Sequence, residues 1–264
     1  MIMKMLLLFI PIIALAACAA GSQLTPEETQ VSLESYANLG SSASEASGDI
    51  LPAMAESQSF FILPPPILDG SKSVEEVLAS RRSRRDFVDR AISLEQLSQI
   101  MWAAYGITYP IPNVPNLRGG LRTTPSAGAT FPLEVYVVVG NVQGLEPGVY
   151  RYISEEHKLV KVIDGDIRNE LSNAALGQTM VRDAPASVFY SAVFYRITGR
   201  YGERGIMYAY IELGHSAQNV YLQVEALGLG TVAIGAFFDD RVRQVLSLPD
   251  NEHPLYIMPF GYFY

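Results

Sequence analysis

Cysteine and histidine are too scarce in this chain of 264 residues to build the usual disulfide and metal sites. Cys18 is the only cysteine, so no disulfide forms within the chain and no cysteine cluster holds zinc. The histidines, His157, His215 and His253, lack the spacing of a metal site or a hydrolytic triad. We therefore expect no metal, and we expect His215 to be a core or interface residue rather than a base.

Basic residues are also scarce, with 19 Lys and Arg against 27 Asp and Glu and a formal net charge of −8. A chain of this charge is not expected to bind nucleic acid. No Lys or Arg occurs between Lys4 and Lys72, which argues against electrostatic docking of this stretch to anionic lipid.

The apolar run at residues 5–20 is short and interrupted by proline, so it is not expected to span a bilayer, and it follows Lys4 as in a signal peptide. Its end, L-A-A-C, resembles the lipobox of bacterial lipoproteins, in which the cysteine becomes the lipidated first residue. We expect a signal peptide over residues 1–17 and lipidation of Cys18, which would anchor the protein in the cell envelope on the periplasmic side of a bacterial membrane. The alternative is an ordinary signal peptide cleaved after a small residue.

Composition predicts a tether followed by one folded domain. Residues 18–60 are rich in Ser, Ala and Glu, which is typical of a flexible acidic linker. Over the whole chain, 49% of residues are hydrophobic and 17% are charged, enough apolar surface for a sizeable core. We expect one catalytic domain over residues 61–264.

Capping signals and apolar periodicity predict that this domain is α+β. S-x-x-E at Ser73 and S-x-x-Q at Ser93 are capping boxes, so a helix should begin at each. Apolar positions spaced by three and four predict a helix over residues 203–227, either a core helix or the spine of a dimer. Strands are predicted at 134–139, 149–153, 159–163, 187–195, 231–236 and 256–260, short helices at 166–176 and 239–246, and a Pro/Gly-rich loop at 109–128.

Four basic residues are concentrated in the arginine run, residues 81–85, whose sequence is R-R-S-R-R. Guanidinium groups so close together repel one another unless solvent or an anion screens them, and Arg and Ser both hydrogen-bond phosphate oxygens. The run should lie at or just past the end of the helix that begins at Ser73. It is either a phosphate site or the solvated C-terminus of that helix.

Two segments of small residues are candidates for ligand-binding loops. Residues 228–233 fit G-x-G-x-x-A by letters, but a helix precedes these glycines and a strand follows them, the reverse of a dinucleotide site. We reject a Rossmann site and expect a helix C-cap there. Residues 124–129, T-P-S-A-G-A, form a turn that lets the backbone approach a planar ligand closely.

The order of these segments resembles the flavin-binding nitroreductase superfamily. The resemblance rests on the arginine run with Phe87, on P-S-A-G leading into P-L-E-V-Y at residues 125–136, and on residues 200–205, 212–219 and 228–237. The later stretches are more narrowly similar to the SagB-type dehydrogenase branch, which includes thiazoline and oxazoline oxidases. The resemblance covers residues 72–262 and implies a central, mostly antiparallel sheet flanked by helices.

The same resemblance implies FMN bound at the interface of a homodimer. FMN calls for cations at two points, because it carries a phosphate dianion and its reduced ring is negative near N1. By the resemblance, Arg81 and Ser83 hold the phosphate with support from Arg82, and Arg85 lies near N1 and O2 of the ring. The ring is lined by a turn made of Pro125, Ser126, Ala127 and Gly128. A backbone amide donates to N5 from the segment Ile234, Gly235 and Ala236.

Two departures from the family pattern change the expected chemistry. The chain ends in F-G-Y-F-Y without the basic residue that grips phosphate in many members, so the arginine run must suffice. The Lys and Tyr that act as acid/base groups in azoline oxidases correspond to Arg200 and Tyr201, and arginine is too basic to abstract a proton at neutral pH. Tyr201 is still able to donate a proton or orient a substrate, and the alternative for Arg200 is a surface ion-pairing residue.

The sequence thus predicts an envelope-anchored FMN oxidoreductase that transfers hydride through flavin N5 on an unidentified small substrate. NAD(P)H is expected to be scarce outside the cytoplasm, so either the reductant is not a nicotinamide or electrons pass from substrate to quinone or oxygen. A peptide azoline dehydrogenase is the alternative among enzymes. A non-catalytic envelope binding or scaffold lipoprotein is the alternative outside them.

Overall fold

The computed structural model describes residues 59–88 and 90–264. The predicted signal peptide, the lipidation site at Cys18 and nearly all of the predicted linker lie outside the described residues. Within those ranges, no helix has both the length and the apolar character that a membrane span requires.

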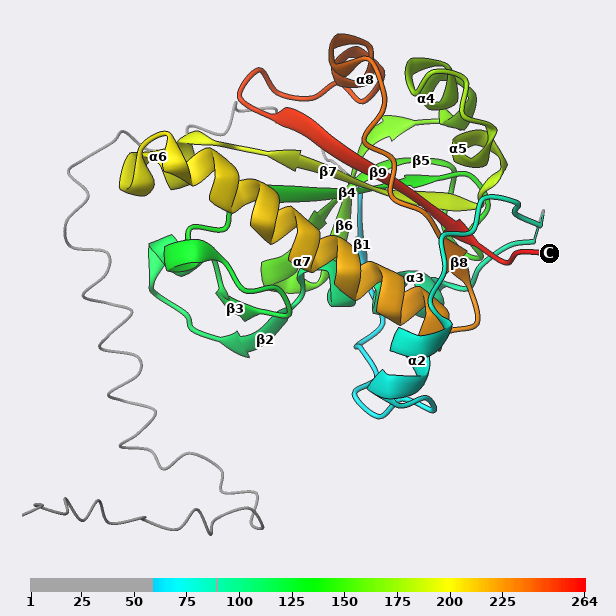
Figure 1. The fold of residues 1–264 in the computed structure, drawn as a ribbon, viewed down its shortest axis with the longest axis horizontal. Coiled ribbons are helices and arrows are strands. Elements are labelled where there is room, and N and C mark those ends of the chain that lie inside the picture. The colour runs from blue at the N-terminus through cyan, green and yellow to red at the C-terminus, as the bar shows by residue number, and fades with distance from the viewer. Residues whose placement is uncertain (1–58, 89) are drawn as a thin grey trace, which may run out of the picture. The chain divides into compact units, whose positions relative to one another are not determined.

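A seven-stranded sheet forms the centre of the domain (Figure 1). Its order is β1-β6-β5-β4-β7-β9-β8, and each neighbouring pair runs antiparallel, which confirms the predicted nitroreductase-like α+β fold. The strands are β1 (Phe60–Ile62), β4 (Leu133–Val139), β5 (Gly148–Ile153), β6 (Lys158–Asp164), β7 (Ala186–Ala192), β8 (Gly230–Thr231) and β9 (His253–Gly261).

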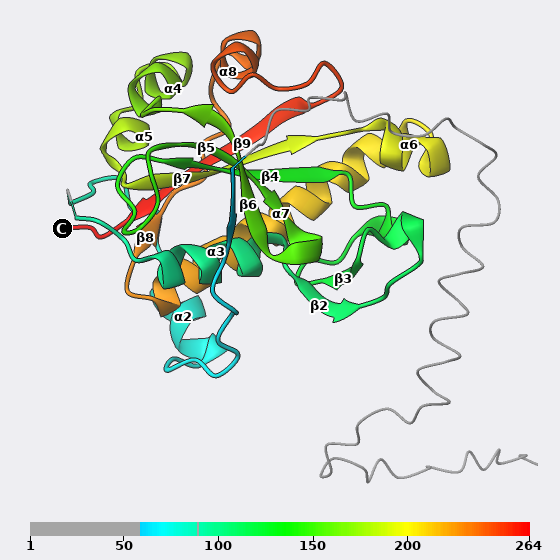
Figure 2. The same cartoon turned by 180° about the vertical axis from the view of Figure 1, so that it is seen from behind.

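Helices cover both faces of this sheet, as its fully buried central strands β4 and β7 require. On one face lie α7 (Arg204–Ala226), which contacts β4 and β9, and α3 (Leu94–Tyr105), which packs along α7. On the other lie α4 (Arg168–Ala174), α5 (Thr179–Asp183) and α8 (Asp239–Val245), grouped at the top of both views (Figures 1 and 2). Neighbouring residues of β7 point to the two different faces. Tyr190 hydrogen-bonds Ser216 of α7, whereas Phe189 packs in the core on the side of α4, α5 and α8.

The two predicted capping boxes are confirmed. The Ser73 hydroxyl accepts from the amide of Glu76 at 3.1 Å and begins α2 (Val74–Ser80), and the Ser93 hydroxyl accepts from the amide of Gln96 at 3.2 Å and begins α3. Arg81 is the C-cap of α2, so the arginine run follows that helix directly, as predicted.

The long helix matches its predicted bounds to within one residue at each end. The periodic positions Leu213, Ala217, Val220 and Val224 are buried, as a core helix requires. Tyr210, also in the periodic set, is instead 51% exposed. It contacts the ring of Phe194 at 5.8 Å and lies beside Met207 and Ile211 in a partly exposed apolar stripe, so α7 is a core helix with one open face.

Three predicted elements were wrong in extent. The strand expected at 231–236 is only β8, followed by irregular chain with one bridge from Ile234 to Ile257. The strand expected at 187–195 ends at Ala192, because α6 (Tyr195–Tyr201) begins three residues later. The loop expected at 109–128 contains most of a two-stranded ribbon of β2 (Ile107–Pro110) and β3 (Gly120–Arg122), whose alternation its Pro and Gly residues obscured.

Candidate functional site

Helix α7 supports both groups of residues that the sequence singles out. Near its C-terminal end Tyr221 contacts the arginine run, and nine residues earlier Glu212 interacts with Ser126 of the 125–128 turn. At 1.5 Å per residue, these two levels are about 14 Å apart along the helix axis. The candidate site therefore has two ends.

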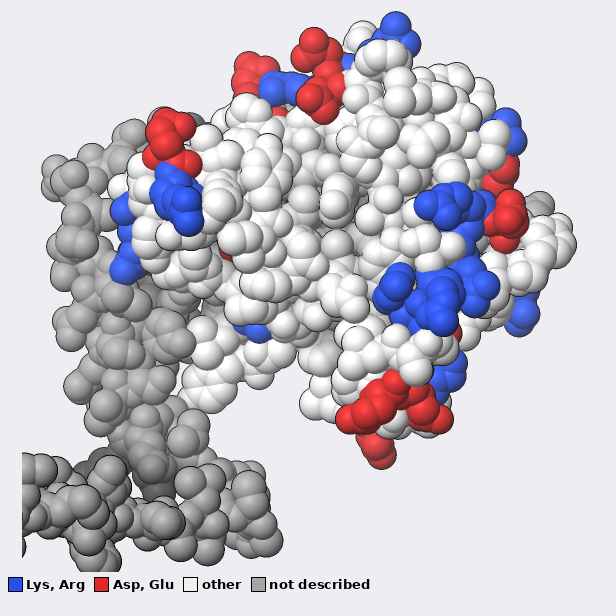
Figure 3. Space-filling model, in the orientation of Figure 1, with Lys and Arg blue, Asp and Glu red and all other residues white. Residues whose placement is uncertain are grey.

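Tyr221 connects the arginine run to the segment that follows β8. Its hydroxyl lies 3.1 Å from the Ser83 hydroxyl and accepts a hydrogen bond from the Ala233 amide at 2.8 Å. The guanidinium of Arg81 lies over its ring at 5.0 Å. Figure 3 shows basic side chains gathered over this end of α7 and β8. Tyr221 was not predicted, because the periodicity of α7 marks its neighbour Val220 and says nothing of contacts 138 residues away.

The arginine run is not a uniform cationic surface. Arg82 turns back and donates to the carbonyls of Ala79 and Arg81 at 3.0 and 2.8 Å, and Arg85 is exposed. Arg84 lies over the ring of Phe263 at 4.5 Å, and its buried Nε has no hydrogen-bond partner. The structure thus brings Arg81 together with Ser83 at Tyr221, whereas Arg84 packs on the aromatic C-terminus through Phe263.

The 234–236 segment presents backbone donors beside this end. Ile234 is held by reciprocal bonds with Ile257, at 2.9 and 3.0 Å, and the Ala236 carbonyl accepts from Gln178 at 2.8 Å. Gly235 and Ala236 are exposed, and among the described residues neither amide has a hydrogen-bond acceptor. Two amides in this state are able to donate to a ligand.

At the other end, the 125–128 turn packs against the predicted catalytic pair. Gly128 has φ +58°, and a Cβ there would lie 2.4 Å from the Tyr201 hydroxyl and 3.1 Å from Arg200 Nε. Only glycine fits this position, because the space is already occupied. Tyr201 is oriented by an edge contact with Tyr208 at 5.2 Å. Arg200 and Tyr201, which come from α6, therefore lie beside the turn.

Hydrogen bonds fix the rest of the turn. The Phe131 amide donates to the Ser126 hydroxyl at 2.9 Å. Asn219 of α7 donates to the Thr123 carbonyl at 3.2 Å and to the Thr124 hydroxyl at 3.3 Å. Pro125 is exposed and Ala127 is half-buried, so the surface of the turn consists of small or rigid side chains.

A buried acid lies behind the turn. Glu212 is 1% exposed, accepts a hydrogen bond of 2.5 Å from the Tyr105 hydroxyl, and interacts with the Ser126 hydroxyl. Burial raises the pKa of Glu212 to about 7, against the opposing effect of these two hydroxyls. The sequence analysis gave Glu212 no role. The signal was available, since Glu212 adjoins Leu213 on the apolar stripe where an unpaired acid is unexpected.

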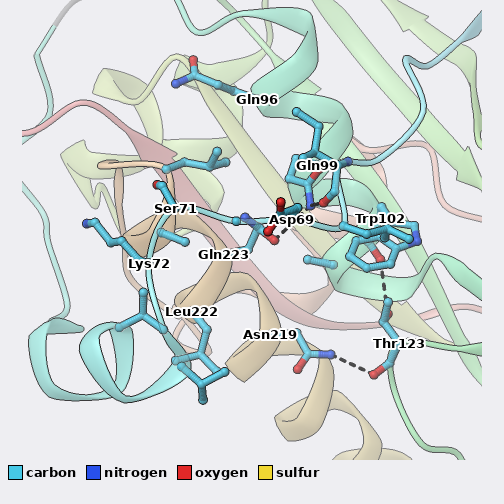
Figure 4. A pocket seen from close by; sticks show the side chains of 18 of the residues that line it. Asp69, Ser71, Lys72, Gln96, Gln99, Trp102, Thr123, Asn219, Leu222 and Gln223 are labelled. Atoms are coloured by element: carbon cyan, nitrogen blue, oxygen red, sulfur yellow. Dashed lines mark hydrogen bonds between the residues drawn. The ribbon is translucent and has the colours of Figure 1, made fainter. Parts of the chain in front are cut away.

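A pocket of about 680 Å³ lies between α2, α3 and α7, a volume typical of small-molecule sites (Figure 4). Trp102, Gln99 and Gln223 line it, and Gln99 donates to Gln223 at 3.2 Å. None of the predicted flavin-binding residues lines it, but Thr123 and Asn219 do, so this pocket adjoins the 125–128 turn.

Comparison with known sequences identifies a family model and several relatives that match this chain. A sequence model of the Nitroreductase family matches residues 78–262. A nitroreductase-family protein of Methanocaldococcus jannaschii is 45% identical over 188 residues, which cover 71% of this chain and 90% of that protein. The NADPH-flavin oxidoreductase of Vibrio harveyi is 30% identical over 113 residues, 39% of this chain and 47% of that one.

A more distant relative is the microcin B17-processing protein of Escherichia coli, 25% identical over 53% of this chain and 54% of its own length. The chain thus spans about half the length of this relative and of the Vibrio enzyme. Among solved structures, a nitroreductase-like protein of Ralstonia eutropha superposes with a TM-score of 0.65 at 28% identity, covering 78% of this chain and 90% of that one.

Proposed function

Because this chain belongs to the Nitroreductase family, we propose that it is an FMN-dependent oxidoreductase that transfers hydride through flavin N5 on a small substrate. The observation that carries the proposal is the junction at Tyr221. One side chain there joins the Arg81–Ser83 pair, which suits a phosphate, to the start of a segment with two unpaired backbone donors. A phosphate with an attached electron-poor ring is the ligand that uses both kinds of donor.

The donor set fits FMN. Arg81 and Ser83 would hold the phosphate, and Arg85 has the charge and exposure to reach the ring near N1 and O2. The amide of Gly235 or Ala236 would donate to N5, which orients the ring without adding a titratable group. When bound, FMN supplies the two-electron chemistry, and the protein supplies position and protons.

The 125–128 turn supplies the flat surface that a ring system needs, with Tyr201 and Arg200 at its edge. Tyr201 is in position to donate a proton or orient a substrate, whereas Arg200 remains charged and binds anions. Because the two ends of the site lie at different levels of α7, the proposal includes a homodimer in which one protomer's arginine run faces its partner's turn.

The microcin-processing relative supports a second candidate, a peptide azoline dehydrogenase. Tyr201, which lies beside the turn, would be the acid or base of such an enzyme. Arg200 weighs against it, because a guanidinium does not abstract a proton. A small-substrate oxidoreductase is therefore the first proposal. A flavin-free scaffold is disfavoured by the intact junction at Tyr221.

Envelope localisation is a proposal that rests on the sequence alone. It requires a signal peptide at residues 1–17 and lipidation of Cys18, both outside the described part of the chain. Mass spectrometry of Cys18 in the protein recovered from a bacterial membrane fraction tests it, because an unmodified or absent Cys18 would contradict a lipid anchor.

The cofactor is tested by incubating the purified protein with FMN, desalting it and recording its visible spectrum. Stoichiometric flavin bands are expected, and the double variant R81A/R85A should weaken binding by about 100-fold or more, because each lost charged hydrogen bond costs about 1.5–3 kcal/mol. The control is R182A/R241A, which removes two exposed arginines outside the proposed site. Full FMN occupancy in R81A/R85A would overturn the site assignment, and a colourless, folded wild-type protein would overturn the cofactor.

A further inference from the structure

Three elements bring polar side chains together beneath the 125–128 turn. Glu212 from α7, Tyr105 from α3 and Arg122 from β3 are all buried, although each carries a group that water would solvate better. Figures 1 and 2 show α3 and the β2–β3 ribbon on the same side of the sheet as α7. Burial of such groups is costly unless they are paired or serve a function.

The pairing in this cluster is incomplete. Glu212 Oε2 is buried without a hydrogen-bond partner, and so are Nε and Nη1 of Arg122. Arg122 lies over the rings of Phe131 at 4.0 Å and Tyr105 at 4.7 Å, and Glu155 is 3.6 Å from its Nη2. An ionised carboxylate with an unsatisfied buried oxygen is disfavoured, whereas a protonated carboxyl at the same place is not.

The groups facing Glu212 determine how it titrates. They are Tyr105, which hydrogen-bonds it, the hydroxyl of Ser126, and the positive charges of Arg122 and Arg118. Burial raises its pKa to about 7, and these four groups limit the rise. Near neutral pH the carboxyl therefore exists in both protonation states.

Ser126 connects this buried carboxyl to the candidate site. Its hydroxyl interacts with Glu212 on one side, while its backbone belongs to the turn that Tyr201 and Arg200 contact. Ser126 is half-buried, whereas Glu212 is fully buried. The hydroxyl is thus the path from the acid to the surface of the turn.

We propose that Glu212 is the internal proton donor of this oxidoreductase and acts through the Ser126 hydroxyl on the molecule bound against the 125–128 turn. The inference rests on the proposed function, because it assumes that reduction occurs at this turn. It makes Glu212 a residue that holds and delivers a proton without touching the substrate.

The step balances for a two-electron acceptor such as a quinone. Reduction of a quinone to a hydroquinone takes one hydride, which carries both electrons, and one proton. The Ser126 hydroxyl proton passes to the quinone oxygen while the Glu212 proton passes to Ser126 Oγ. Glu212 is left as a carboxylate, the Ser126 hydroxyl is restored, and solvent later returns one proton to Glu212.

The first test needs neither flavin nor substrate. Infrared spectra of the flavin-free protein are recorded from pH 5 to pH 9, and we expect the carbonyl band of a protonated carboxylic acid to disappear with a midpoint at about pH 7. The band should be absent from E212Q and present in E252Q. Glu252 is the matched control, because it is also buried and bonded by two hydroxyls, from Tyr136 and Ser191, but on the opposite face of the sheet. A band that E212Q retains in full overturns the proposal.

The second test uses the FMN-loaded protein reduced by dithionite and mixed with menadione. E212Q should slow reoxidation by about 100-fold at pH 7, the contribution of a positioned proton donor, and should lose the decrease that wild type shows above pH 7. S126A should show the same loss, and the double variant no further loss, because both residues lie on one path. E252Q should behave as wild type.

The outcomes separate this inference from the proposed function. Wild-type rate and pH profile in flavin-loaded E212Q overturn the proton donor and leave the flavoenzyme intact. Additive losses in E212Q/S126A overturn the Ser126 path. If no variant, including wild type, binds FMN, the proposed function fails, and the infrared band alone then reports whether Glu212 holds a proton. If E212Q does not fold, S126A provides the same comparison with the acid in place.

Discussion

At the scale of single residues, the pKa values of two buried glutamates are shifted in opposite directions. Glu134 is 3% exposed and pairs with Arg118, Arg151 and Arg196 at 3.0, 2.7 and 2.5 Å. Burial alone would raise its pKa, but the three guanidinium groups lower it to about 2. Glu212 has weaker compensation, and burial raises its pKa to about 7. The number of positive charges around the carboxylate, rather than its burial, therefore decides whether its pKa rises or falls.

The first prediction concerns acid stability. The pKa of Glu134 is lowered on folding from 4.5, so its contribution is present above pH 4.5 and is lost as the pH falls through about 2. The shift corresponds to about 3 kcal/mol of unfolding free energy. In E134Q the free energy of unfolding should not show this decrease between pH 4.5 and pH 2. At pH 7 it should be lower than that of wild type by about 3–5 kcal/mol, because three arginines remain unpaired. Chemical denaturation at a series of pH values measures both effects, and wild-type stability of E134Q at pH 7 would contradict the assignment.

At the scale of elements, structure that depends on residues three or four positions apart was predictable from the sequence. Structure that depends on distant residues was not. The capping boxes at Ser73 and Ser93 need only a residue three positions away, and both helices begin as predicted. The 232–236 segment looks like a strand in sequence, yet it pairs only at Ile234. Tyr221 was missed for the same reason, since its contact with Ser83 spans 138 residues, whereas Glu212 was missed although its place among the apolar residues of α7 marks it.

The second prediction compares the two capped helices. α3 has twelve residues, most of them buried, so S93A should lower the global free energy of unfolding by about 1 kcal/mol, the usual effect of a lost N-cap. α2 has seven residues and only Val77 is buried, so S73A should instead increase hydrogen exchange in α2 and the arginine run, with little global change. Denaturation and hydrogen exchange of both variants test this, and equal global destabilisation would show that α2 unfolds only with the whole domain.

At the scale of the whole molecule, the open face of α7 and the separation of the two ends of the site point to the same assembly. Met207, Tyr210 and Ile211 are 38%, 51% and 46% exposed and form one stripe on the helix. The arginine run and the 125–128 turn lie at levels about 14 Å apart on that helix. A two-fold axis through the stripe would place each protomer's turn near its partner's run. The exposed apolar stripe on α7 is thus also the surface whose burial in a dimer would complete the site.

The third prediction follows from this geometry. Wild type should be a dimer by light scattering, and M207E/I211E should be monomeric, because burying four unpaired carboxylates would weaken association by more than about 100-fold. The monomer should also lose FMN, although its arginine run is unchanged. The control L176E places one charge at a leucine that is 54% exposed outside the stripe, so it should keep both the dimer and the cofactor. A monomeric wild type with one FMN per chain would show that a single protomer completes the site. In that case the turn and the run must both reach the ring from one chain, and the exposed stripe on α7 would need another explanation.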